Sequence, residues 1–155
     1  MIDKKNLTNK IGGYESSDFG RMDLNQIIGK YSSKKVDIKE KVLLIKLSKS
    51  FRYNMSEVEL YDYTRGIWII SEEKRNEIEY VFCVYDGIVQ ETYNVIDWFP
   101  GGSTYSVRHD KEEWKIHERW EFVGNISHEM RKKYRHKSVS HYFPSGSRNP
   151  VRYTF

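Results

Sequence analysis

The dipeptide Asp86-Gly87 constrains the fold of this chain more than any other feature of the sequence. Residues 78–85 before it and residues 88–99 after it are rich in β-branched and aromatic side chains. Asp-Gly between two such runs is the strongest short-range signal of a β-hairpin, because both positions of the tight turn need a positive φ. The sequence therefore predicts two adjacent antiparallel strands joined by a two-residue turn.

Shorter patterns predict the elements around this hairpin. The run Val42–Leu47 is apolar enough for a buried strand. Ser56 and Glu59 match a capping box that begins a helix over 57–65, and Gly66 is expected to end that helix in the left-handed conformation. Further predicted elements are strands over 67–70, 119–123 and 149–153, helices over 22–28 and 128–135, and an extended segment over 139–143.

Together these elements predict an α+β fold. The strands outnumber the helices and their spacing does not follow a βαβ repeat, which favours a curved mixed or antiparallel sheet, or a small open barrel, with two short helices packed on it. Residues 1–41 are polar and are interpreted as an N-terminal arm. Residues 42–155 are interpreted as a single domain, which is an ordinary size for one hydrophobic core.

Composition excludes several classes of protein. Cys83 is the only cysteine, so no disulfide framework exists, and its apolar surroundings predict a buried, inert thiol. The five histidines show no zinc-type spacing, and no phosphate-binding loop or nucleophile elbow is present. No secretory signal precedes the polar start, and no apolar run is long enough to span a membrane. We expect a cytoplasmic protein without a cofactor, a metal or a membrane partner, and not an enzyme.

Charge is distributed unevenly along the chain. Residues 1–52 contain 12 Lys and Arg against 6 Asp and Glu, residues 53–130 contain 7 against 16, and residues 131–155 contain 7 against none. A long segment without any carboxylate indicates an anionic partner, or a pairing of opposite faces within the molecule.

The densest basic run is Arg131–Ser138, where five cations fall within seven residues. Lys and Arg neutralise phosphates and release counterions, while Tyr134, Tyr142 and Phe143 offer rings for stacking on unpaired bases. The alternatives are a solvated helix end, stabilised by its cations near the carboxyl terminus, and pairing with the acidic middle of the chain. The run favours a nucleic-acid-binding module.

Three smaller groups add candidate residues. The turn 145–149 offers backbone amides and Arg148 for an anion, or is an ordinary turn before a strand. Arg65 with Trp68 suits a stacked nucleotide, or a core ring beside an arginine paired on its own helix. Arg119 with Trp120 has the same ambiguity. The predicted anion-binding residues are Arg65, Trp68, Arg119, Arg131, Lys132, Lys133, Tyr134, Arg135, Lys137, Ser138, Tyr142, Arg148, Asn149 and Arg152.

Other functions remain open from the sequence. Asp97 with Glu113 and Lys115 imitates the metal site of many restriction nucleases, in which carboxylates hold Mg²⁺. A second alternative is a non-enzymatic protein that sequesters a signalling nucleotide or docks on a host defence complex. A protein partner could use the acidic middle or the N-terminal arm.

A family resemblance points the same way. Its motifs are Thr64–Trp68, Phe82–Val89, Arg119–Gly124, Lys137–Val139 and Asn149–Tyr153. This set resembles small uncharacterised domains that accompany nucleases and restriction or defence systems in bacteria and phages, and the layout over residues 42–155 is similar to PUA-like folds such as the ASCH and EVE domains. The resemblance implies a small pseudo-barrel that binds RNA or modified bases, with a role in phage or defence biology.

Overall fold

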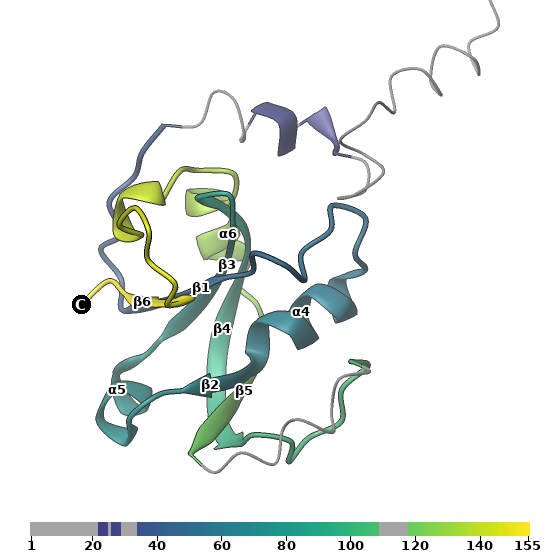
Figure 1. Cartoon of the computed structure of the whole chain (residues 1–155), viewed down its shortest axis with the longest axis vertical. Helices are drawn as coiled ribbons and strands as arrows, with labels where there is room; N and C mark the ends of the chain where they lie inside the picture. The colour runs from purple at the N-terminus through teal and green to yellow at the C-terminus, as the bar shows by residue number, and fades with distance from the viewer. Residues whose placement is uncertain (1–21, 25, 29–33, 109–117) are drawn as a thin grey trace, which may run out of the picture.

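The computed structural model describes residues 22–24, 26–28, 34–108 and 118–155. Six strands form one mixed sheet in the order β2-β5-β4-β3-β1-β6, curled into a half-barrel (Figure 1). Neighbouring strands are antiparallel except β1 and β3, which are parallel. The strands are β1 (Val42–Lys46), β2 (Gly66–Ile69), β3 (Tyr80–Tyr85), β4 (Ile88–Pro100), β5 (Arg119–Ile126) and β6 (Val151–Tyr153). The predicted α+β class with a curved mixed sheet is confirmed.

The hairpin that anchors the sequence argument forms as predicted. Asp86 and Gly87 join β3 to β4 with φ values of 51° and 73°, which are the two positive values that a tight primed turn needs. The first strand starts later than the predicted Ile78. That residue instead caps α5 (Glu72–Glu77), a short helix that the sequence analysis did not anticipate and whose amino end is capped by Ser71.

Helix α4 (Glu57–Arg65) begins at the predicted capping box, with Ser56 and Glu59 each accepting the other's backbone N–H. The expectation for Gly66 is wrong. Its φ is −158°, which is extended backbone, and it opens strand β2 directly after the helix. Glycine is required there by space, because a Cβ at Gly66 would lie 2.9 Å from the Cβ of Glu121 on β5.

Helix α6 (His128–Tyr134) starts at Ser127, whose side chain accepts from the backbone of Met130 as predicted. The extended segment predicted over 139–143 is wrong, because residues Ser140–Tyr142 form a 3₁₀ helix, η2. Val139 donates its N–H to the carbonyl of Gly87 at 2.8 Å, which brings the start of η2 against the β3–β4 turn. The backbone then turns, and Tyr142 donates to the carbonyl of Val139.

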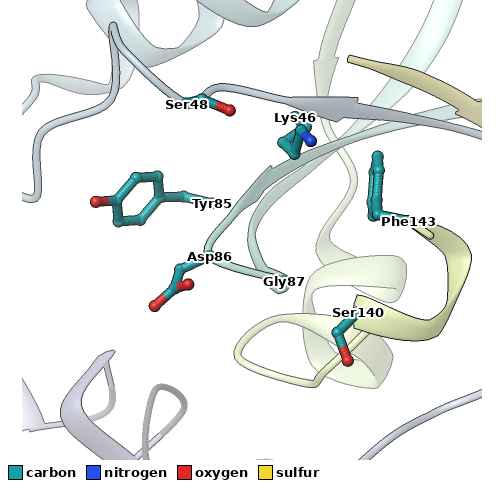
Figure 2. A pocket seen from close by; sticks show the side chains of 7 residues that line it. All are labelled: Lys46, Ser48, Tyr85, Asp86, Gly87, Ser140 and Phe143. Carbon is teal, nitrogen blue, oxygen red and sulfur yellow. The ribbon is translucent and has the colours of Figure 1, made fainter. Parts of the chain in front are cut away.

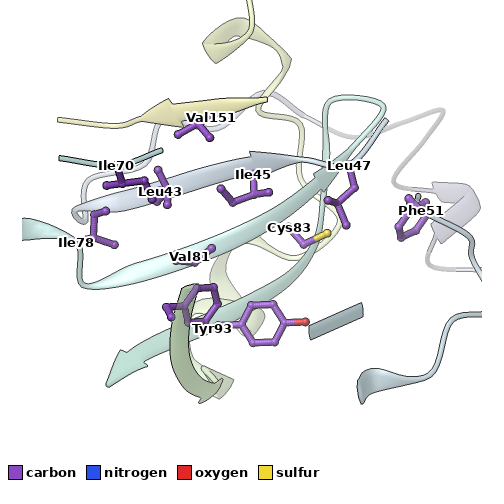
Figure 3. Close-up of a cluster of buried hydrophobic side chains, with 11 residues drawn as sticks. Leu43, Ile45, Leu47, Phe51, Ile70, Ile78, Val81, Cys83, Tyr93 and Val151 are labelled. Carbon is purple, nitrogen blue, oxygen red and sulfur yellow. The ribbon is translucent and has the colours of Figure 1, made fainter. Parts of the chain in front are cut away.

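One hydrophobic cluster covers one side of the sheet (Figure 3). Alternate residues of β1 and β3 point into it, including Leu43, Ile45 and Cys83, and Phe122 joins them from β5. Partly buried rings of α4 and β4 pack against this cluster, so the helix is held by apolar burial as well as by its caps. No helix in the described parts of the chain is long and apolar enough to cross a membrane.

A second cluster covers the other side of β1 and β3. Val42, Leu44 and Phe82 pack there against Met130 and Tyr134 of α6. Residues 34–41, the described segment of the predicted arm next to β1, also lie on this side and contribute buried Ile38 to the cluster. Residues 34–41 therefore pack directly on the body of the fold.

The helix predicted around residues 22–28 is partly described. Leu24 and residues 26–28 are helical, and Ile27 donates to the carbonyl of Asp23 at 3.0 Å. Leu24, Ile27 and Ile28 expose 71%, 41% and 51% of their surface, so this turn does not contribute to the core.

Candidate anion-binding surface

The first cation of the basic run is held inside the molecule. Arg131 donates from Nε and Nη2 to both carboxylate oxygens of buried Glu91, at 2.9 and 2.6 Å, and reaches Glu57 at 3.5 Å. The hydrogen bonds that Arg131 donates to Glu91 raise the pKa of Arg131 above its ordinary value. Because a two-pronged contact to a buried carboxylate fixes the guanidinium, Arg131 ties α6 to the β4 strand.

Lys133 and Tyr134 converge on a single acid from the segment 34–41. Lys133 contacts one oxygen of Glu40, and the Tyr134 hydroxyl donates to the other at 2.5 Å. Burial alone would raise the pKa of the Glu40 carboxyl, but the hydrogen bonds from Lys133 and Tyr134 outweigh it and lower the pKa to about 2. These contacts join the segment to α6.

Two further arginines of the predicted set also contact the chain itself. Arg135 donates to the carbonyl of Gln90 at 2.9 Å and lies 4.0 Å from Glu91. Arg152 on β6 donates to the carbonyl of Val151 at 2.9 Å and to the hydroxyl of Ser147. Neither guanidinium is free to turn fully towards a ligand.

Three cations of the segment 131–155 remain available. Lys132, Lys137 and Arg148 are exposed and make no hydrogen bond or ion pair with any residue that the structure describes. The acidic middle of the chain therefore neutralises part of the basic segment and leaves these three positions to solvent.

Two basic stretches that are distant in the sequence meet beside Ser138. The backbone of Ser138 pairs with Lys35 in a parallel bridge, accepting from Val36 and donating to Lys34 at 3.0 Å each. The backbones of Lys34 and Lys35 therefore lie beside that of Lys137, and all three side chains are exposed and without a carboxylate partner in the described part of the chain. We call these three residues the lysine cluster. Ser138 itself is buried, and it pairs with the lysine segment through its backbone.

The rings predicted to stack on bases are engaged elsewhere. Tyr134 is only 7% exposed, and the hydroxyl of half-buried Tyr142 accepts from the backbone of Ile38 at 2.9 Å. Phe143 is partly buried and packs against the second cluster. Tyr134 and Tyr142 are therefore not placed to stack on a base, and the lysine cluster offers charge to a ligand without stacking from these two residues.

Arg65 lies in the interior, where it is 3% exposed. Its Nε donates to Asp62 on the same helix at 2.6 Å, its other nitrogens donate to Thr104 and to the carbonyl of Tyr105, and Glu121 lies 3.8 Å away. The two carboxylates accept in turn from the backbone of the loop after β4. This network fixes the loop to α4, and the buried position of Arg65 keeps its guanidinium away from an external anion.

Trp68 and Arg119 both make contacts at strand β2, which lies at one edge of the sheet. Trp68 packs against the first cluster and donates to the carbonyl of Thr64 at 2.8 Å. Arg119 donates to the carbonyl of Ile67 at 3.4 Å, and Arg108 donates to that of Gly66 at 2.6 Å. Because β2 is an edge strand, side-chain donors on its carbonyls hinder pairing with another chain.

The predicted anion turn and the nuclease alternative have less support in the geometry. Asn149 uses its side-chain oxygen to accept from Val151 at 2.9 Å, which is a local turn contact. Asp97 is exposed and accepts from the next backbone N–H, while Glu113 and Lys115 lie outside the described residues. The described residues contain no group of three His, Cys, Asp or Glu suited to a metal.

Cys83 is buried as predicted, and burial raises its pKa to about 12.

The comparison with known proteins adds no relative. Family models, curated proteins and solved structures give no match to this chain.

Sequence reasoning missed Lys34 and Lys35, although a signal for them existed. Residues 34–52 carry seven Lys and Arg against two acids. Interpreting residues 1–41 as an arm separated this charge from the basic run at the other end of the chain. Only the pairing with Ser138 brings the two stretches together.

Proposed function

We propose that this chain binds the phosphate backbone of nucleic acid through the lysine cluster. The observation that carries the proposal is the bridge between Lys35 and Ser138, which brings the backbones of three exposed lysines, unpaired within the described residues, side by side from two basic stretches. Such groups gain free energy by displacing condensed counterions from phosphates, whatever the base sequence.

The proposed mode of binding is electrostatic and does not depend on stacking. Tyr134 and Tyr142 are committed to internal contacts, so they do not present flat rings to unpaired bases. The domain should therefore bind single and double strands with similar affinity and show little base preference. The curled sheet is compatible with the PUA-like layout that the sequence resembles, and a phage or defence setting belongs to the same proposal.

Fluorescence anisotropy with a labelled oligonucleotide tests this function. The variant Lys34→Gln, Lys35→Gln, Lys137→Gln removes the cluster without touching a residue of either hydrophobic cluster. Its affinity should fall at least tenfold, because it loses about three phosphate contacts.

The matched control removes the same number of positive charges elsewhere. In Lys41→Gln, Lys49→Gln, Lys74→Gln, the substituted residues lie at the start of β1, after β1 and on α5. It should bind as the unmodified chain does. Equal losses in both variants would show that net charge alone drives binding, and unmeasurable binding by the unmodified chain at low salt would refute the proposal.

A further inference from the structure

A surface pocket of about 400 Å³ lies where the end of β1, the β3–β4 turn and η2 meet (Figure 2). This volume falls within the range of small-molecule sites. Three separate segments of the chain contribute its walls. The lining residues are Lys46, Ser48, Tyr85, Asp86, Gly87, Ser140 and Phe143.

The walls of this pocket are held in place by internal contacts. The Tyr85 ring stacks on Phe51 with centroids 4.4 Å apart. The turn and η2 are joined by the hydrogen bond from Val139 to Gly87, and a Cβ at Gly87 would come within 2.8 Å of the Cβ of Ser140. The cavity is therefore formed before a ligand arrives, which limits the ordering entropy that binding must overcome.

Two opposite charges line the pocket without pairing with each other. Lys46 donates to the carbonyl of Ser147 at 3.1 Å and lies 5.5 Å from the centroid of the Phe143 ring, which orients the ammonium group. The Asp86 carboxylate is exposed and makes no hydrogen bond or ion pair with any described residue. An ammonium group has three donors, so Lys46 retains donors beyond the one given to Ser147.

The arrangement combines charges with apolar and hydroxyl surfaces. Figure 2 shows Tyr85 and Phe143 on opposite sides of the space, with Asp86 near the turn and Lys46 near the end of β1. Ser48 and Ser140 add hydroxyl groups that can donate or accept. A ligand with only one charge would leave either Lys46 or Asp86 without an opposite charge beside it.

We infer that this pocket binds a small zwitterion, with the ligand's anionic group on Lys46, its cationic group on Asp86 and its apolar part against the rings that line the pocket. Each charged contact is a charge-assisted hydrogen bond, which is roughly twice as strong as a neutral one. Asp86 repels phosphodiesters, so this site is distinct from the lysine cluster and does not depend on it.

A titration followed by two-dimensional amide NMR tests the inference on the full chain. The zwitterionic probes are phenylalanine and δ-aminovalerate, and the singly charged analogues are phenethylamine, hydrocinnamate, pentylamine and valerate. At least one zwitterion should shift the amide signals of Gly87 and Ser140 saturably at millimolar concentration or below. It should bind about tenfold more tightly than either of its singly charged analogues.

Asp86→Asn provides the decisive variant. Asparagine tolerates the positive φ of this turn position, so the hairpin keeps its geometry while the charge is lost. Zwitterion affinity should fall about tenfold. Asp97→Asn makes the same chemical change on β4, outside the pocket, and should leave the affinity unchanged.

Three outcomes would overturn the inference. The first is the absence of saturable shifts at the pocket residues with either zwitterion. The second is equal affinity for a zwitterion and its singly charged analogues. The third is equal affinity in Asp86→Asn and Asp97→Asn, because that would separate binding from the Asp86 charge.

Discussion

At the scale of single residues, the most consequential side chain is Arg65. It lies between two buried carboxylates, Asp62 and Glu121, which also hold the backbone of the loop after β4. A buried ion pair adds little stability compared with an apolar replacement, but the removal of one partner leaves uncompensated charge in the interior. Arg65 therefore offsets the free-energy cost of burying the Asp62 and Glu121 carboxylates.

Arg65→Met should lower the free energy of unfolding by about 3–5 kcal/mol, because two buried carboxylates lose their cation. Urea denaturation measures the change. Lys132→Met is the control, since Lys132 is exposed and unpaired within the described residues, and it should shift stability by no more than about 0.5 kcal/mol. Adding Asp62→Asn and Glu121→Gln to Arg65→Met should restore part of the loss, and a further loss would contradict this account.

Glu40 gives stability a defined pH dependence. Its pKa is about 2 in the folded chain against an ordinary value of 4.5, because the hydrogen bonds from Lys133 and Tyr134 favour the charged form. A carboxyl with a lowered folded pKa stabilises the fold above its unfolded pKa, and the contribution fades as the pH falls towards the folded value.

The comparison of Glu40→Gln with the unmodified chain isolates this effect. The urea midpoint of the unmodified chain should exceed that of the variant at about pH 6, and the difference should shrink at about pH 3. A difference that stays the same at both pH values would show that the Glu40 charge is not responsible.

At the scale of elements, the β4–β5 pair depends on one close approach. A Cβ at Gly124 would lie 2.0 Å from the carbonyl oxygen of Asn94, next to the irregularity between Val95 and Asp97. No side-chain adjustment can relieve a contact with backbone, so only glycine fits there without moving a strand.

Gly124→Ala should therefore cost about 3 kcal/mol or more in unfolding free energy. Gly146→Ala is the matched comparison. Its φ is +78°, but nothing lies within 4 Å of the added Cβ, so only the left-handed backbone penalty of about 1–2 kcal/mol applies. Chemical denaturation of both variants measures the difference, and equal costs would argue against the close approach.

Local chemistry predicted the elements that carry their own signals. The Asp86-Gly87 turn, the Ser56 capping box and the Ser127 cap are decided by neighbours in the sequence, and all three form. Gly66 and the segment 139–143 were mispredicted because distant groups decide them. Pairing with Glu121 on β5 holds Gly66 in an extended conformation, and the β3–β4 turn holds Val139.

At the scale of the whole molecule, charge segregation along the sequence becomes a surface pattern only after folding. The sequence predicted that residues 131–155 carry excess positive charge, and Lys132, Lys137 and Arg148 do remain exposed. It could not predict which cations would form ion pairs with Glu91 and Glu40, because those contacts join segments about 40 and 93 residues apart. The pairing of 34–36 with Ser138 was equally hidden.

The affinity of the whole domain for nucleic acid should depend steeply on salt. Three phosphate contacts imply roughly a 20- to 40-fold loss of affinity between 50 and 200 mM monovalent salt, with single strands at the lower end. Anisotropy titrations at several salt concentrations give the slope. In the variant that lacks the lysine cluster the slope should be close to zero, and a slope unchanged from the unmodified chain would place the phosphate contacts elsewhere.

Lysine acetylation footprinting with mass spectrometry tests the central claim most directly, because it reports each ammonium group separately in the presence and absence of an oligonucleotide. We expect Lys34, Lys35 and Lys137 to be protected several-fold by the oligonucleotide, while Lys41, which precedes β1, and Lys74 on α5 react as they do in the free chain. Protection spread evenly over all lysines, or confined to lysines outside the cluster, would contradict the account.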